Sequence, residues 1–296
     1  MAVSKLETKK YLAFKQDGIT YNLYDMPKGF VIKGNLDLSD KGLTELPDLS
    51  EVVVKGSFYC AYNQLTTLKG APQTVGGYFY CSDNQLTSLE GSPKEVGRDF
   101  NCFSNQLTSL EGAPQRVGGD FNCDNNQLTS LEGAPKEVGR NFYCGSNQLT
   151  SLEGSPQIVG GGFYCSFNQL TSLEGAPKEV GGYFRCYNNQ LTSLVGLPQM
   201  KECMKIYCDY SLGNKYGFSN TINNGVPYEQ LCASPLYKSE DAMNRVRSKL
   251  PPKQVETKEN LTTPNLTNQQ QEEAFEKINA EFSQWLKDNS AKPIRE

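Results

Sequence analysis

The sequence predicts an α/β-type repeat solenoid with a curved parallel β-sheet on its concave face and irregular segments on its convex face. The first observation is a 21-residue unit that is repeated seven times between Phe58 and Leu194. The second is a pair of apolar residues, Phe and Cys, that stand two apart in each copy. The third is the phrase Asn-Gln-Leu-Thr, which begins at Asn63, Asn84, Asn105, Asn126, Asn147, Asn168 and Asn189.

The pair Phe100 and Cys102 shows how one copy is expected to form a strand. Residues two apart in an extended chain point to the same side, so both side chains can enter one core. Asn105 follows where the chain must leave the strand, and its amide can bond free backbone groups there. Because the seven Asn residues recur at one spacing, we expect their amides to form an internal ladder.

The second half of each copy is expected to return along the opposite side. Leu107 and Leu110 supply apolar side chains for the core on this path. Gly112 and Pro114 follow them and prevent a long helix. One copy is too small to bury its own apolar face, so neighbouring copies must stack into one continuous core.

This pattern resembles the leucine-rich repeat, whose consensus is L-x-x-L-x-L-x-x-N-x-L-x-x-L. Here V-x-x-x-F-x-C-x-x-N-x-L-x-x-L fits it over roughly residues 30 to 212. The near-identical NQLTSLEGAP units are similar to short-repeat proteins of bacteria and their phages. The resemblance implies the fold and says little about function.

The departure from that pattern is Cys where Leu is usual, as at Cys102 and Cys123. One interpretation is a small buried apolar residue that leaves room beside the bulky Phe. The alternative is a column of neighbouring thiols that form disulfides or hold a metal, because adjacent strands lie roughly 4.8 Å apart. No Cys-x2-Cys pair occurs in the repeats and the chain has no His, so we predict no metal and no cofactor.

The boundary between the N-terminal region and the repeats is expected after residue 33. Residues 1–33 are expected to form an N-terminal cap, with a short helix to about Phe14, a turn at Asp17-Gly18 and a strand from Ile19 to Tyr24. Residues 34–212 hold one divergent, seven regular and one degraded repeat. Terminal repeats are usually atypical because one of their faces meets a cap.

After the repeats, residues 213–250 are expected to form a C-terminal cap, mostly loop to 238 and then a short helix over Glu240 to Leu250. Residues 251–266 are expected to form a polar linker that contains three prolines. Residues 267–289 follow as an amphipathic tail helix that either packs back on the repeats or serves docking and self-association. Its apolar stripe contains Phe275, Ile278, Phe282 and Trp285.

Composition excludes several classes of function. The chain has 29 basic and 33 acidic residues and a net charge of −4, without a Lys/Arg cluster, so we expect no nucleic-acid partner. No apolar run approaches the ~18 residues of a membrane span. The N-terminus lacks an apolar signal region, so we expect a cytoplasmic protein, located in a host cytoplasm or a virion if phage-encoded. Without any His, Ser-His and Cys-His nucleophile pairs cannot form, and we expect no enzyme.

The candidate site comes from comparing the copies with one another. The framework hardly varies, whereas the strand positions that alternate with Phe and Cys do, and alternation puts them on the concave face. That face is rich in Tyr, which is common in binding surfaces but is also a good strand residue. The candidate partner-binding residues are Tyr59, Tyr78, Tyr80, Asp99, Asn101, Phe103, Asp120, Asn122, Asp124, Tyr143, Tyr164, Tyr183, Arg185 and Tyr187.

Two functions remain open from the sequence. The first is a non-enzymatic module that binds a protein partner on the concave face. The second is a structural or carbohydrate-binding virion component in which the Tyr rows stack on sugar rings.

Overall fold

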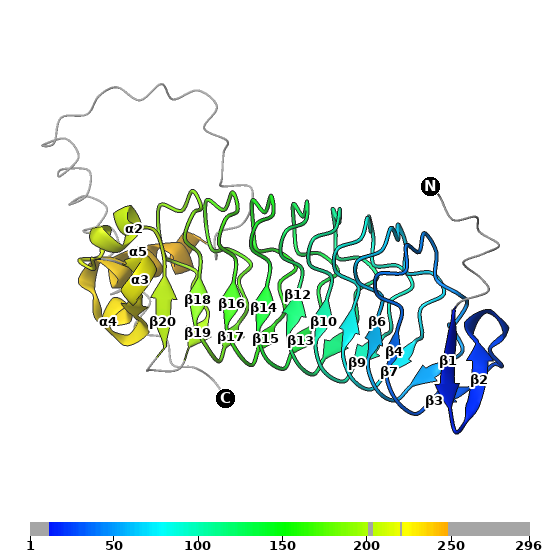
Figure 1. Cartoon of the computed structure of the whole chain (residues 1–296). Helices are drawn as coiled ribbons and strands as arrows, with labels where there is room; N and C mark the ends of the chain where they lie inside the picture. The colour runs from blue at the N-terminus through cyan, green and yellow to red at the C-terminus, as the bar shows by residue number, and fades with distance from the viewer. Residues whose placement is uncertain (1–11, 201–203, 220, 248–296) are drawn as a thin grey trace, which may run out of the picture. The chain divides into compact units, whose positions relative to one another are not determined.

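The computed structural model describes residues 12–200, 204–219 and 221–247, and its repeats stack into two long sheets (Figure 1). Each regular copy contributes one short strand to each sheet. The larger one, here called the main sheet, has ten strands. They are β4 (Leu36–Asp37), β6 (Phe58–Tyr59), β8 (Phe79–Tyr80), β10 (Phe100–Asn101), β12 (Phe121–Asn122), β14 (Phe142–Tyr143), β16 (Phe163–Tyr164), β18 (Phe184–Arg185), β20 (Lys205–Tyr207) and β21 (Val226–Pro227).

The strands of the main sheet are parallel, except that β21 runs antiparallel to β20. The constant repeat length sets their register: Phe100 pairs with Phe79 on one side and with Phe121 on the other. Equal positions of neighbouring copies therefore lie side by side. The predicted stack of parallel strands with non-repeat ends and C-terminal helices is confirmed.

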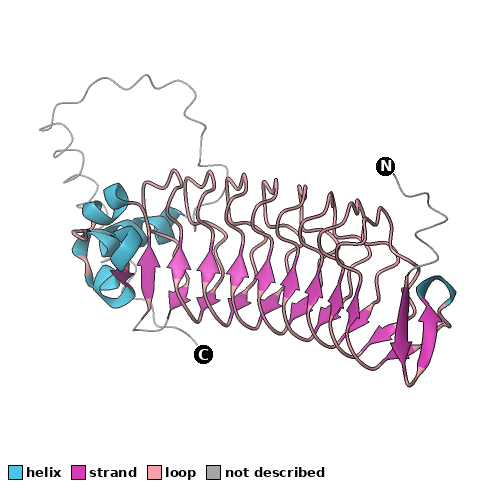
Figure 2. Cartoon of the chain, viewed as in Figure 1, coloured by secondary structure: helices cyan, strands magenta, loops and turns pink. Residues whose placement is uncertain are grey.

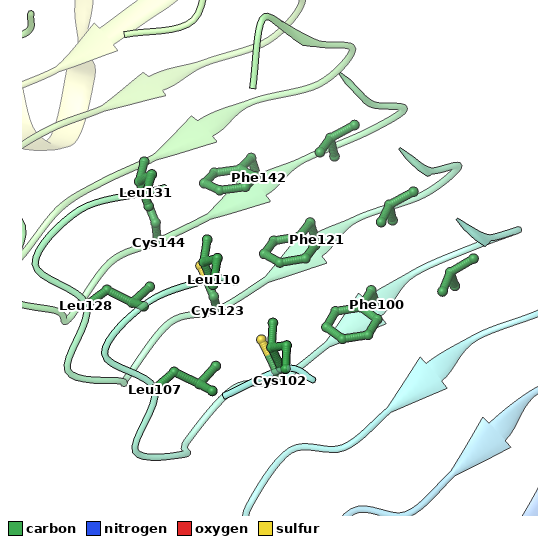
Figure 3. Packing of buried hydrophobic residues seen from close by; sticks show 14 of the residues in the cluster. Phe100, Cys102, Leu107, Leu110, Phe121, Cys123, Leu128, Leu131, Phe142 and Cys144 are labelled. Atoms are coloured by element: carbon green, nitrogen blue, oxygen red, sulfur yellow. The ribbon is translucent and has the colours of Figure 1, made fainter. Parts of the chain in front are cut away.

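The core is built from the same few positions in every copy (Figure 3). Phe100, Cys102, Leu107 and Leu110 are completely buried, and so are their counterparts in the next copies. The Phe rings form a continuous column, in which Phe100 and Phe121 stack with centroids 5.3 Å apart. Every copy thus buries its apolar face against its neighbours, as the sequence predicted.

The Cys column occupies the small apolar position beside these rings. Cys123 is fully buried, and its Sγ donates to the carbonyl oxygen of Tyr143 in the next copy, at 3.1 Å. Burial raises the pKa of the Cys123 thiol well above its ordinary value. The nine cysteines within the described ranges are free thiols. Their burial fits the interpretation of Cys as a small core residue.

The predicted irregular segments are present, as over residues 102–114, but the repeats also form a second parallel sheet of nine strands that was not predicted from the sequence. Its strands are β3 (Val31–Ile32), β5 (Val53–Val54), β7 (Thr74–Val75), β9 (Glu95–Val96), β11 (Arg116–Val117), β13 (Glu137–Val138), β15 (Ile158–Val159), β17 (Glu179–Val180) and β19 (Gln199–Met200). A Gly follows the strand Val in six of the seven regular copies and permits this pairing. A Cβ on Gly97 would lie 2.2 Å from the carbonyl oxygen of Gly76, so only Gly allows the chains to approach.

The N-terminal end is an antiparallel hairpin of β1 (Ala13–Gln16) and β2 (Ile19–Asn22), followed by the 3₁₀ turn η1 (Leu23–Asp25). Asp17 and Gly18 form the expected turn, both with positive φ. The expected helix to Phe14 is wrong over its last residues, which belong to β1. The rest of that helix lies outside the described residues. The Gln16 side chain bonds Val31 O and Lys33 N and so covers the edge of β3.

The C-terminal end is helical where the sequence predicted mostly loop (Figure 2). Its helices are α2 (Tyr210–Lys215), α3 (Thr221–Asn224), α4 (Tyr228–Ala233) and α5 (Pro235–Arg247). Helix α5 begins at Pro235 rather than Glu240, because Pro suits the first position of a helix. The predicted linker 251–266 and tail helix 267–289 lie outside the described residues.

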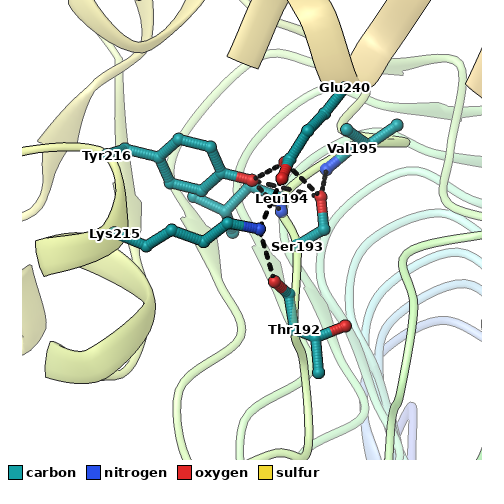
Figure 4. A network of polar contacts seen from close by, with 7 residues as sticks. All are labelled: Thr192, Ser193, Leu194, Val195, Lys215, Tyr216 and Glu240. Carbon is teal, nitrogen blue, oxygen red and sulfur yellow. Dashed lines mark hydrogen bonds and ion pairs between the residues drawn. The ribbon is translucent and has the colours of Figure 1, made fainter. Parts of the chain in front are cut away.

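A polar network fastens these helices to the last regular repeat (Figure 4). Glu240 on α5 accepts from Tyr216 and from Ser193 of that repeat, and it forms an ion pair with Lys215. Burial opposes ionisation of Glu240, but the bonds from Lys215, Tyr216 and Ser193 outweigh it and lower the pKa of this carboxyl. The carboxylate is therefore the form that holds the cap in place.

Candidate interaction surface

The ends of the main-sheet strands are fixed by the ladder of Asn side chains. Asn126 Oδ1 accepts from the backbone N–H of Leu107, and its Nδ2 donates to the carbonyls of Cys102, Cys123 and Asp124 at 3.1–3.2 Å. All seven Asn residues donate in the same way to the preceding copy. The predicted ladder is confirmed. It holds each strand end at one height, so the outward side chains fall into straight columns.

The architecture of each copy is now defined. It consists of an inward Phe and Cys, an Asn that bridges to the preceding copy, and two Leu residues on the return path. The fold is a solenoid of the leucine-rich repeat type. This assignment rests on the repeat, its register and the Asn ladder.

Comparisons with known proteins add a partial likeness. No protein-family model and no curated protein matches the sequence. Among solved structures, the leucine-rich repeat solenoid is similar to the LRR domain of a Shigella effector, with 23% identity and a TM-score of 0.42 over 53% of this chain and 70% of that one. It is also similar to YopM, a leucine-rich effector protein from Yersinia pestis, with 20% identity and a TM-score of 0.39. That match covers 59% of this chain and 55% of YopM, so it spans about half of the latter's length.

The fourteen candidate residues lie together on one surface, here called the strand face. It consists of the main-sheet positions just before and just after each Phe and just after each Cys. These positions alternate with the buried Phe and Cys, and none of the fourteen side chains is buried. Phe103 and Tyr183 are exposed and the other twelve are half-buried. The candidate tail-helix residues Phe275, Ile278, Phe282 and Trp285 lie outside the described residues.

The first aromatic cluster of the strand face contains Tyr59, Tyr78 and Tyr80. The Tyr80 ring lies 5.5 Å from each of the other two ring centroids. Arg98 stands over the Tyr78 ring and donates from Nη1 to its hydroxyl at 3.3 Å. Burial, aided by the Asp99 carboxylate, raises the pKa of Tyr80 to about 12, so its hydroxyl stays a neutral donor at physiological pH.

The polar side chains in the middle of the strand face are partly exposed, and they also form hydrogen bonds that hold the repeats together. Asp99 Oδ1 accepts from the backbone N–H of Asp120, and Asp120 Oδ1 accepts from that of Asn141, each at 2.9 Å. Asn101 and Asn122 bond the backbone two residues further along their own strands. These side chains thus join copies or close turns, and only part of their bonding capacity remains for a partner.

Asp124 is the most enclosed carboxyl of this middle section. Its Oδ1 accepts from the backbone N–H of Gly145 in the next copy. Burial raises the pKa of Asp124 to about 6, although the bond from Gly145 acts in the opposite direction. Its charge therefore changes close to neutral pH.

The second aromatic cluster contains Tyr143, Tyr164, Tyr183 and Tyr207, with Arg185 among them. Tyr143 and Tyr164 stack at 4.6 Å with an interplanar angle of 11°, and Tyr183 meets Tyr207 edge-on at 5.7 Å. A Cβ on Gly162 would lie 2.7 Å from atoms of the Tyr164 ring. The absence of a side chain at Gly162 thus makes room for this ring to lie flat.

Sequence reasoning missed two exposed aromatic residues at the turn before the Asn ladder. Tyr62 and Phe167 are 64% and 53% exposed, and both have a left-handed backbone, with φ of 56° and 59°. The same position holds Asp, Ser or Asn in the other regular copies. Comparing the copies at this fourth column would have found them. Bulky residues are rare at positive φ, so their presence indicates a surface role that outweighs backbone preference.

The described ranges contain no group of three or more Cys, Asp or Glu side chains placed to hold a metal ion. None of their helices is long and apolar enough to cross a membrane.

Proposed function

We propose that this leucine-rich repeat solenoid is a non-enzymatic protein-binding module that holds its partner on the strand face. The observation that supports this most directly is the contrast between the copies. Their buried framework is nearly constant, whereas the exposed columns differ and gather aromatic residues into two clusters.

The size of the strand face suits a macromolecular partner. The ten strands of the main sheet, at ~4.8 Å each, span roughly 40 Å. Tyr and Arg are enriched at the energetic centres of protein interfaces; Tyr occurs at each end of this face, and Arg185 lies near one end. The two clusters provide two contact points with a polar section between them.

A role in nucleophilic catalysis is poorly supported by the chemistry of the thiols. The repeat cysteines are fully buried, and burial raises their pKa values far above neutrality, as it does for Cys144. A thiolate is the nucleophilic form of Cys, so these side chains are unreactive in the folded state.

Carbohydrate binding is the weaker alternative. Sugar rings need a free aromatic face, and Tyr143 and Tyr164 each have one face covered by the other ring. The remaining pairs, such as Tyr59 and Tyr80, meet edge to face and also contact each other.

The test is capture of partners by the immobilised full chain, with quantitative mass spectrometry. The surface variant replaces Tyr80, Tyr143 and Tyr164 with Ala, and its control replaces Lys136 and Glu137, on the second sheet, with Ala. We expect wild type and control to enrich the same protein and the surface variant to lose it. Undiminished capture by the surface variant, with matching circular dichroism spectra, would contradict the proposal.

A further inference from the structure

Arg185 occupies an unusual place in the second aromatic cluster. It stands in register with Tyr164 on one neighbouring strand and with Tyr207 on the other. Its Cζ atom lies 5.3 Å from the Tyr164 ring centroid and 4.9 Å from that of Tyr207. The guanidinium is therefore held between two aromatic rings that flank it from adjacent strands. Such rings attract a cation and shield it from water.

The charge of Arg185 is not balanced by the described part of the chain. No described carboxylate forms an ion pair with it. Its Nε is buried and donates to no acceptor within the same ranges. The corresponding position in the other regular copies is always an uncharged Tyr or Asn. A half-buried cation without a counter-ion is unfavourable in the free protein, and an oxyanion bound at the edge of the guanidinium would balance its charge.

The geometry specifies the chemistry of that anion. With rings on both faces, the guanidinium can bind only along its edge. Edge donors of Arg form paired hydrogen bonds with a planar carboxylate, and the flanking rings strengthen these bonds by excluding water. Tyr187 follows two residues after Arg185 on the same strand face, and its ring meets Phe167 edge-on at 5.5 Å. An apolar contact thus lies next to the anion position.

We propose that Arg185 is the anchor for a Glu or Asp side chain in an acidic peptide segment of the partner, with an apolar neighbour of that residue resting on Phe167 and Tyr187. This inference rests on the proposed function and names the partner's chemistry. The carboxylate of this segment bonds the edge of the Arg185 guanidinium, and the rest of the strand face adds contact area.

Arg98 supplies a matched control. It also stands over a Tyr ring, Tyr78, at 5.5 Å, but its side chain is exposed and already donates to the Tyr78 hydroxyl. The same change at Arg98 removes one positive charge and one cation–aromatic contact without touching the second aromatic cluster.

The test is selection of unmodified random peptides by the full chain, followed by fluorescence anisotropy with a selected peptide. Wild type and Arg98→Gln are expected to enrich peptides with an acidic residue beside an apolar one, and Arg185→Gln to lose that enrichment. Arg185→Gln, or Glu→Gln in the peptide, should each weaken binding about tenfold. Combining the two changes should cause little further loss, because both remove the same contact.

Arg185→Lys separates recognition from folding. It keeps a cation between the rings, so its thermal midpoint should match wild type, while the loss of the planar fork weakens the peptide at least threefold. Equal affinity of the wild-type and Arg185→Gln chains would overturn the inference, as would enrichment of no acidic peptide. If the selected peptides nevertheless lose their binding when Tyr80, Tyr143 and Tyr164 are replaced, the proposed function survives without the acidic anchor. If neither set of changes matters, both fail.

Discussion

Backbone conformation at single residues distinguishes structural from functional positions on this surface. In each regular copy, the residue before the ladder Asn has a positive φ. Asp, Asn and Ser tolerate that conformation better than large side chains do. Tyr62 and Phe167 depart from the rule and are both largely exposed. Two turns therefore hold residues that their backbone conformation disfavours. Because these side chains are largely exposed, packing in the core does not compensate for that strain.

Phe167→Asn should raise stability and weaken partner binding. Asn adopts the left-handed conformation more readily than Phe, so we expect a gain of about 1 kcal/mol in the free energy of unfolding. Urea denaturation measures this gain. Ser146→Asn is the control at the same position of the preceding copy and should change stability less. A loss of stability in Phe167→Asn would show that the contact with Tyr187 outweighs the backbone strain.

The carboxyl of Asp124 makes stability depend on pH. Its native pKa of about 6 lies above the unfolded value of about 4, so the unfolded state loses this proton first as pH rises. The contribution of Asp124 to stability is therefore full below about pH 4 and is lost as pH rises through 6.

Asp124→Asn should remove that loss. Asn keeps an oxygen for the Gly145 N–H and carries no charge. We expect the variant to be more stable than wild type by about 2 kcal/mol at pH 7.5 and nearly equal to it at pH 4. Urea midpoints at both pH values measure the difference, with Glu132→Gln as a control for net charge. A stability difference that does not grow with pH would contradict the assignment.

Strands of two residues persist only because of side-chain bonds at their ends. Each main-sheet strand of a regular copy is too short to be stable alone, and the Asn amide ties it to the preceding copy. Four backbone groups depend on Asn126 in this way. The Asn side chains are thus as important to each strand as its backbone hydrogen bonds with the neighbouring strands.

Asn126→Ala should be strongly destabilising. It leaves the N–H of Leu107 and the carbonyls of Cys102 and Cys123 without their side-chain partner, and we expect a loss of about 3 kcal/mol or more. Gln127→Ala is the control, because that neighbouring side chain is exposed. Urea denaturation followed by circular dichroism compares the two. Similar midpoints for both variants would mean that water replaces the amide without penalty.

On the scale of the whole molecule, stability is expected to be a sum of units and of their interfaces. Every regular copy repeats the same backbone, and Ser104 and Asn125 hold equivalent turn positions with φ of 55° and 57°. Joining Ser104 to Asn126 would therefore recreate a native junction. The solenoid should accept the loss of a complete unit but not of a part of one.

Deletion of residues 105–125 should give a folded, shorter solenoid with a lower urea midpoint, because one unit and one interface are lost. Deletion of residues 105–115 removes Leu107 and Leu110 but keeps the next strand, so we expect it to abolish cooperative unfolding. Circular dichroism and urea titration distinguish the two outcomes. Equal behaviour of both deletions would contradict the description of the chain as a stack of equivalent units.

Much of this architecture follows from spacing alone. Phe100 and Cys102 stand two apart and Asn105 follows at a fixed distance, which predicted the inward pair, the ladder and the outward columns. The second sheet was missed because its strands have only two residues and most of them bury a single apolar side chain, as at Val96, which is too short a pattern to predict a strand. The C-terminal helices were missed because Gly213, Gly217 and Gly225 favour loops, whereas packing against β20 and β21 permits short helices.

The sequence by itself determined that this protein is a stack of equal units, because a constant repeat length forces equal residues into register. It also determined which side chains face outward, because strand alternation leaves no choice once Phe and Cys are buried. Only the tertiary structure decided what those side chains do. Asp99 and Asp120 became bridges between copies, Tyr164 came to lie over Gly162, and Arg185 came to stand between two rings. The bridges of Asp99 and Asp120 and the ring contacts of Arg185 join residues 21 or 22 positions apart, and their distances are set by the stacking of neighbouring strands.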